Sequence, residues 1–110
     1  MITTTDDKVK IYKAHNIAAK QMDREVGAEF KIEDVIQFET FRNSGEPAVS
    51  TVIFTQSGDV YSTLSPTVDR SVNDLLNVFG DDFRKVTAKI VNGNSNSGRK
   101  FLQIDAVSID

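Results

Sequence analysis

The last third of the chain places basic side chains beside an aromatic ring. Together they can attract an anion and stack on a planar ring. Lys89 precedes a polar loop over 92–98, and Arg99-Lys100-Phe101 follows it. Sequence-tolerant binding of a nucleic-acid single strand requires cations along the phosphates and exposed rings on which bases stack. The pattern therefore predicts phosphate neutralisation by Lys89, Arg99 and Lys100, with Phe101 available for stacking.

Three aromatic rings are candidates for the stacking surface, because each lies out of phase with core positions of its strand. Phe101 alternates with Leu102, so it points outward if Leu102 enters the core; packing beneath the neighbouring loop is the alternative. Tyr61 alternates with Val60 in the same way and is predicted to lie on the binding face. For the third candidate, Phe54, burial in the core is the favoured interpretation, since barrel strands bury parts of both faces.

Two loops complete the candidate site. The loop over 92–98, which includes Asn94, lacks the spacing of a nucleotide-binding P-loop and is interpreted as a flexible hairpin tip. In an OB-fold such a loop closes over a nucleic-acid strand. Arg42 lies in the loop over 42–47, at the opposite rim of the groove, and is either a phosphate contact or a solvated charge.

The residue types give little support to catalysis or metal binding. The chain has no cysteine and one histidine, His15, so disulfides, thiolate ligands and cysteine nucleophiles are excluded. The paired carboxylates Glu33-Asp34 and Asp81-Asp82 lack the ligand spacing of a calcium loop and are predicted to be solvated. We therefore expect no enzymatic activity, no metal and no cofactor.

The charge distribution is polarised, although the net charge is only −3. Residues 84–100 carry five basic side chains and no acidic one, and residues 8–24 carry five basic side chains and one acid. Acidic side chains are concentrated over 25–46 and 69–82. This distribution allows a cationic surface on an acidic protein.

Length and composition predict one soluble domain. With 110 residues, 39% hydrophobic and 26% charged, the chain has room for a single core. No apolar run approaches the roughly 18 residues of a membrane helix, and the N-terminus does not resemble a signal peptide. We expect an N-terminal extension over 1–15 and a single domain over 16–110, in the cytoplasm because cysteine is absent.

Hydrophobic periodicity predicts five strands and an amphipathic helix. The strands are expected over 29–41, with a bulge near Asp34, and over 48–55, 60–64, 85–91 and 99–107. One apolar stripe predicts a helix over 68–79, its members being Val68, Val72, Leu75, Leu76 and Phe79. Nearer the N-terminus we expect a frayed segment over 1–7, a strand over 8–14 and a short helix over 16–27 with Asn16 as N-cap.

This order of elements predicts a mainly β fold. Three strands, a helix and a final hairpin are the arrangement of an OB-fold-like, five-stranded, partly open barrel, with the helix between strands three and four. A small sandwich or a PH-like roll is the alternative.

Three parts of the chain resemble small single-stranded DNA-binding proteins of bacteriophages. They are VGAEF at 26–30 with IEDVI at 32–36, YSTLSPT at 61–67 before a helix ending in VFG at 78–80, and KIVNGNS at 89–95 with GRKF at 98–101. The resemblance implies sequence-tolerant coating of single-stranded DNA in replication or recombination, in the host cytoplasm. It also implies replication proteins as possible partners and a possible homo-oligomer or cooperative array.

A non-enzymatic protein-interaction module, or a small phage structural subunit, is the alternative on the same fold. Exposed rings flanked by cations would indicate DNA as the binding partner, whereas rings in an uncharged patch would indicate a protein. The distinguishing feature is whether Tyr61 and Phe101 lie exposed beside Lys89, Arg99 and Lys100.

Overall fold

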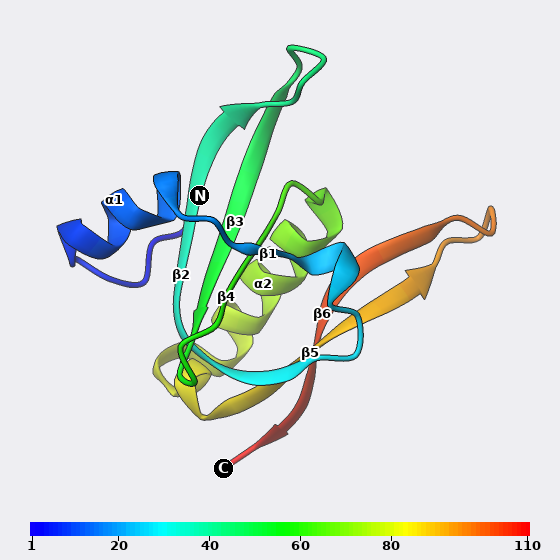
Figure 1. Cartoon of the computed structure of the whole chain (residues 1–110). Helices are drawn as coiled ribbons and strands as arrows, with labels where there is room; N and C mark the ends of the chain where they lie inside the picture. Colours follow the sequence, from blue (N-terminus) through cyan, green and yellow to red (C-terminus); the bar gives the residue numbers. More distant parts are fainter.

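The computed structural model describes residues 1–110 and contains one curled sheet with two α-helices and two 3-10 helices (Figure 1). In chain order the elements are α1 (Lys8–Asn16), β1 (Lys20–Gln21), η1 (Met22–Arg24), β2 (Glu29–Phe41), β3 (Pro47–Thr55), β4 (Val60–Thr63), α2 (Pro66–Phe79), η2 (Gly80–Lys85), β5 (Val86–Asn94) and β6 (Lys100–Ile109). Strands are neighbours in the order β1-β4-β3-β2-β5-β6. None of the helices is long and apolar enough to cross a membrane.

β2 is the centre of the sheet because it pairs with two different strands along its length. Residues 29–31 pair with β5, and the rest of the strand pairs with β3. The register shifts between Ile32 and Asp34, which is the bulge predicted near Asp34. A bulge bends a strand and increases its twist. β2 therefore turns from one partner to the other, and the sheet curls with it.

The curled sheet is a partly open barrel, as predicted. β6 ends one side of the sheet, and β1 ends the other, where Lys20 pairs in parallel with Tyr61 of β4. The five other strands lie where the periodicity predicts them, except that β5 continues to Asn94 and so includes the start of the loop predicted over 92–98. The two-residue β1 is an addition. The mainly β, OB-fold-like prediction is confirmed, with α2 lying between β4 and β5 in the chain.

α2 packs on the sheet through the apolar stripe predicted for it. Val68, Val72 and Leu75 are buried and belong to the main core of the protein. The helix begins after Ser65, whose hydroxyl accepts the backbone N–H of Val68 at 3.4 Å, and it ends at Gly80, where φ is 54°. The helix therefore ends where predicted. It begins two residues before Val68, the predicted start, because Ser65 caps it.

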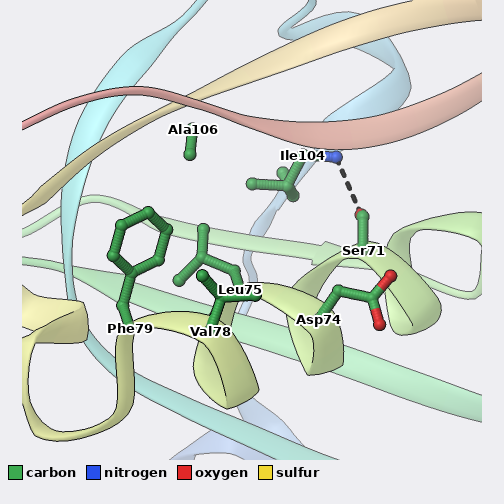
Figure 2. Close-up of a pocket in the computed structure, with 7 residues that line it drawn as sticks. All are labelled: Ser71, Asp74, Leu75, Val78, Phe79, Ile104 and Ala106. Carbon is green, nitrogen blue, oxygen red and sulfur yellow. Dashed lines mark hydrogen bonds between the residues drawn. The ribbon is translucent and has the colours of Figure 1, made fainter.

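α2 also occupies part of the free edge of β6. The Oγ atom of Ser71 accepts the backbone N–H of Ile104 at 2.9 Å, as Figure 2 shows, and the hydroxyl of Thr67 donates to the carbonyl of Leu102. Thr67 and Ser71 share one helix face because four residues separate them. Unpaired groups on an edge strand invite pairing with another chain. The helix satisfies two of these groups and holds the last hairpin in place.

The N-terminal elements differ from the prediction. A helix, α1, replaces the strand predicted over 8–14, and the helix predicted over 16–27 is absent, since that stretch forms β1 and η1. The true N-cap is Asp7, whose carboxylate accepts the N–H groups of Val9 and Lys10 at 3.0 and 3.2 Å. Asn16, predicted to be an N-cap, is instead the last residue of α1.

Tertiary contacts explain this difference. The alternation of Lys and apolar residues over 8–14 fits a strand, but as a helix the segment buries Ala14 against Ile36 and Val52 in a small second core. The residues after α1 cannot continue a helix because Lys20 is paired with Tyr61. Packing thus decides between two local structures that the pattern alone permits.

The first residues are held to β2 and are not frayed as predicted. The backbone N–H of Thr4 donates to Val35 at 3.0 Å, and that of Gln37 donates to Ile2 at 2.8 Å. The N-terminus therefore lies along the edge of β2 that β5 leaves free.

Candidate nucleic-acid interface

The β5–β6 hairpin projects from the body of the protein as an arm (Figure 1). Its ladder extends to the pair Asn94 and Lys100, and the turn closes with the N–H of Ser95 donating to the carbonyl of Arg99 at 2.8 Å. Gly98 in this turn has φ of 79°, a left-handed conformation that favours glycine. Arg99 and Lys100 are exposed and make no ion pair. The arm therefore extends two free cations into solvent, as the sequence predicts.

Phe101 is half-buried at the base of this tip. It is paired with Gly93, and its ring covers the glycine so closely that a Cβ there would lie 2.4 Å from the ring. On the side toward α2, the ring lines a cavity of about 390 Å³ together with Ser95, Arg70 and Asp74. One part of the ring is therefore packed and another is accessible, which combines the two interpretations that the sequence left open.

Lys89 has an acidic register partner on each neighbouring strand. It is half-buried, and its register partners are Glu29 of β2 and Asp105 of β6. Residues directly opposite in an antiparallel pair share one face, with their Cβ atoms about 5 Å apart. Two acidic residues therefore share the face of Lys89, although neither makes an ion pair with it, and this makes Lys89 a weaker candidate for a phosphate than Arg99 or Lys100.

Arg42 stands on a separate arm, the β2–β3 hairpin (Figure 1). The side chain is exposed and makes no ion pair, and its Nη2 donates to the carbonyl of Leu64 at 3.1 Å. The neighbouring Phe41 is 71% exposed. Strand periodicity gave no reason to single out Phe41, because its exposure depends on the hairpin extending past the body.

Tyr61 was predicted to lie exposed on the binding face, and this prediction is wrong. The residue is 5% exposed, and its ring stacks on Phe30 with centroids 5.1 Å apart. Burial raises the pKa of the Tyr61 hydroxyl. The cause is register: Tyr61 is paired with Ile53, and paired residues share a face, so both enter the core. Val60 is turned toward α1 instead.

Phe54 is half-buried beneath α1, in agreement with the burial favoured for it. It packs against the small core that contains Ala14 and Ile36. The Nζ atom of Lys10 lies 5.6 Å from the centroid of its ring. In this structure α1 therefore stands between Phe54 and solvent.

Asp34 was predicted to be solvated with Glu33, but the structure buries it. Its carboxylate accepts Lys10 Nζ at 2.7 Å, Arg84 Nη2 at 2.9 Å and the Thr4 hydroxyl at 2.8 Å. Burial by itself would raise the pKa of Asp34, but the hydrogen bonds from Lys10, Thr4 and Arg84 outweigh it and lower the pKa. This cluster ties α1 and η2 to the bulge of β2.

Ion pairing divides the basic side chains into two groups. Five of the thirteen are paired with carboxylates: Lys10, Lys20, Lys31, Arg84 and Lys85. The eight without an ion pair are Lys8, Lys13, Arg24, Arg42, Arg70, Lys89, Arg99 and Lys100. Free cations therefore remain on α1 and on both hairpin arms. No group of three or more His, Cys, Asp or Glu side chains is placed to hold a metal ion.

A small open β-barrel with a cationic hairpin and a half-exposed ring has the features of a module that binds single-stranded nucleic acid. The comparison with protein families agrees. The family described as phage single-stranded DNA-binding protein, of the Phi29 type, matches residues 1–106, so the chain belongs to this family of single-stranded DNA-binding proteins that serve phage replication. Searches of the curated proteins and of the solved structures found no match.

Proposed function

We propose that the protein coats single-stranded DNA without sequence preference, and that the β5–β6 arm makes the principal contact. The observation that carries the proposal is the pair of free cations, Arg99 and Lys100, at the tip of the arm, directly before Phe101 in the chain, whose ring is partly accessible. Arginine and lysine meet phosphate oxygens, which are the same at every nucleotide. A ring accepts any base, because every base has a π-face. Neither contact reads sequence.

Two further side chains extend this contact. Asn94 is exposed opposite Lys100 at the tip of the arm, where its amide can hydrogen-bond a phosphate or a base edge. Arg42 offers a second cation on the β2–β3 hairpin. Tyr61 and Phe54 are left out of the proposed contact, since the first is in the core and the second lies beneath α1.

The proposed role is non-catalytic binding in phage replication or recombination, in the host cytoplasm. One domain of 110 residues covers few nucleotides, so coating a long strand requires many copies side by side. We therefore propose a cooperative array or a homo-oligomer on the DNA, with other replication proteins as further partners.

The test is binding of oligo(dT), oligo(dC) and a mixed-sequence strand, with duplex DNA of equal length for comparison. We expect similar affinity for the three single strands and weaker binding of the duplex. Replacing Arg99 and Lys100 together by alanine should weaken the binding of all three alike. The slope of log affinity against log salt should become shallower by roughly 0.7 for each phosphate that the variant no longer neutralises.

A matched control removes two lysines that are already paired, Lys31 and Lys85, and so changes the net charge equally. This control should leave the salt slope nearly unchanged. An equal loss of affinity in both double variants would mean that net charge, and not the arm, governs affinity. No binding of any single strand by the unaltered protein would overturn the proposed function.

A further inference from the structure

The outer face of α1 carries an exposed aromatic ring among unpaired lysines. Tyr12 is 70% exposed, and together with Lys13, Asn16 and Ile17 it lines a shallow hollow of about 290 Å³. Lys8 lies one turn before Tyr12, and neither Lys8 nor Lys13 makes an ion pair. The helix itself contains three lysines and no carboxylate.

Side chains on either side of Tyr12 in the sequence fix α1 to the sheet, so this outer face cannot turn inward. Ala14 is buried, and the Nζ atom of Lys10 is 2.7 Å from the carboxylate of Asp34. The ring of His15 stacks on Phe38, with the centroids 3.9 Å apart and an interplanar angle of 22°. Three contacts along the helix therefore hold Tyr12 toward solvent.

We propose that this outer face of α1 is a second contact for single-stranded DNA, in which a base stacks on Tyr12 while Lys8 and Lys13 meet phosphates. The inference rests on the proposed function and extends it to a part of the chain outside the arm. A ring with adjacent cations is the combination that single strands require. Charge complementarity selects a polyanion as the occupant, because a purely apolar partner would leave the lysines unused.

The other highly exposed ring, Phe41, is less suitable. It lines its own hollow with Glu39, whose carboxylate would repel a phosphate, and no basic side chain lines that hollow to offset the repulsion. The hollow beside Tyr12 is lined by no carboxylate, and Asp7, at the start of α1, is engaged as the N-cap. The electrostatic surroundings of the two rings therefore favour Tyr12.

The chain that follows α1 leads toward the arm. It runs from α1 through β1 and η1 to β5, as Figure 1 shows, and the N–H of Gly27 donates to the carbonyl of Ile90 at 2.7 Å. Arg24, on this connection, is exposed and makes no ion pair. One free cation, Arg24, thus lies on the connection between α1 and the hairpin.

The test uses the fact that the chain has two tyrosines and no tryptophan. In Tyr61→Phe protein, Tyr12 is the sole strong emitter, and oligo(dT) should quench most of its fluorescence. In Tyr12→Phe protein, the buried Tyr61 is the sole emitter, and the same titration should leave its emission nearly unchanged. Tyr12→Phe should keep its affinity because the ring remains, whereas Tyr12→Ala should bind roughly tenfold more weakly.

The lysines are tested separately. Lys8→Ala/Lys13→Ala should make the salt slope shallower than in the unaltered protein, while the control Lys31→Ala/Lys85→Ala should not. Tight oligo(dT) binding by Tyr61→Phe protein with unquenched Tyr12 emission would overturn this inference and leave the arm as the binding site. Absence of binding by the unaltered protein would instead overturn the proposed function itself.

Discussion

The ring of Phe101 lies over Gly93 of the paired strand, where an added Cβ would be 2.4 Å from the Cζ atom of the ring. Real Cβ atoms essentially never approach another atom within 3.0 Å. The ring can keep this position only while residue 93 has no side chain. Covering a strand glycine with an aromatic ring also helps to fix strand register. Gly93 thus sets where Phe101 is presented.

We expect Gly93→Ala to displace the Phe101 ring. The unfolding free energy should fall by about 1 kcal/mol, the lower end of the cost of overpacking, and oligo(dT) affinity should fall because the ring is misplaced. Urea denaturation and fluorescence anisotropy measure the two effects. In a Phe101→Ala background the same change should be nearly neutral. Equal costs in both backgrounds would contradict the contact.

Leu75→Ala should empty a site in the main core. Leu75 is 5% exposed, so its loss should lower the unfolding free energy by about 2–5 kcal/mol. Val78, on the same helix and 76% exposed, is the matched control, and Val78→Ala should change stability by less than about 0.5 kcal/mol. Similar denaturation midpoints for the two variants would show that α2 is not packed as described.

Tyr61→Ala should act on stability, not on stacking with DNA. Removing a ring packed on Phe30 should cost about 3–5 kcal/mol, the range for large aromatic truncations in a core. Tyr61→Phe should be nearly neutral because the ring, not the hydroxyl, fills the core. Thermal denaturation checks both variants. A stable Tyr61→Ala protein with weakened DNA binding would place this ring in the interface after all.

Asp34 should make stability sensitive to acid. Its folded pKa is lowered, so its ionised form stabilises the protein above the unfolded pKa of about 4, and this contribution is lost as pH falls from there through the folded pKa. Asp34→Asn should cost about 1–3 kcal/mol at neutral pH and flatten the acid limb of a urea-midpoint profile. Asp82→Asn, which alters an exposed pair with Lys85, should leave the profile unchanged.

Most of the framework follows from local pattern. The stripe from Val68 to Phe79 has the period of a helix, and the broken alternation near Asp34 has one cause, an extra residue in a strand. Each of these patterns is formed by residues that are near one another in the chain, so it can be read directly from the sequence. The position of Arg99 and Lys100 at a hairpin tip follows equally from the polar loop before them.

The N-terminal quarter could not be predicted in this way. In the segment 8–14 lysine and apolar residues alternate well enough for a strand, and the segment is also polar enough for a surface helix. The choice depends on Ala14 meeting Ile36 and Val52, and on Lys10 reaching Asp34, which are contacts between residues far apart in the chain. No local pattern contains them. The exposure of Tyr12 follows from the same contacts and was missed with them.

The sequence by itself determined the mainly β architecture, the amphipathic helix, the bulge and a cationic last hairpin, because each depends on the spacing of neighbouring residues. Tertiary structure decided which rings and charges are free. Tyr61 is buried because its register partner is Ile53, and Lys89 has the acidic register partners Glu29 and Asp105 on its face. Strand register pairs residues that are distant in the chain, so it is not contained in any local pattern. The side chains on both faces of a strand repeat every two residues, so alternation alone does not show which face is exposed to water.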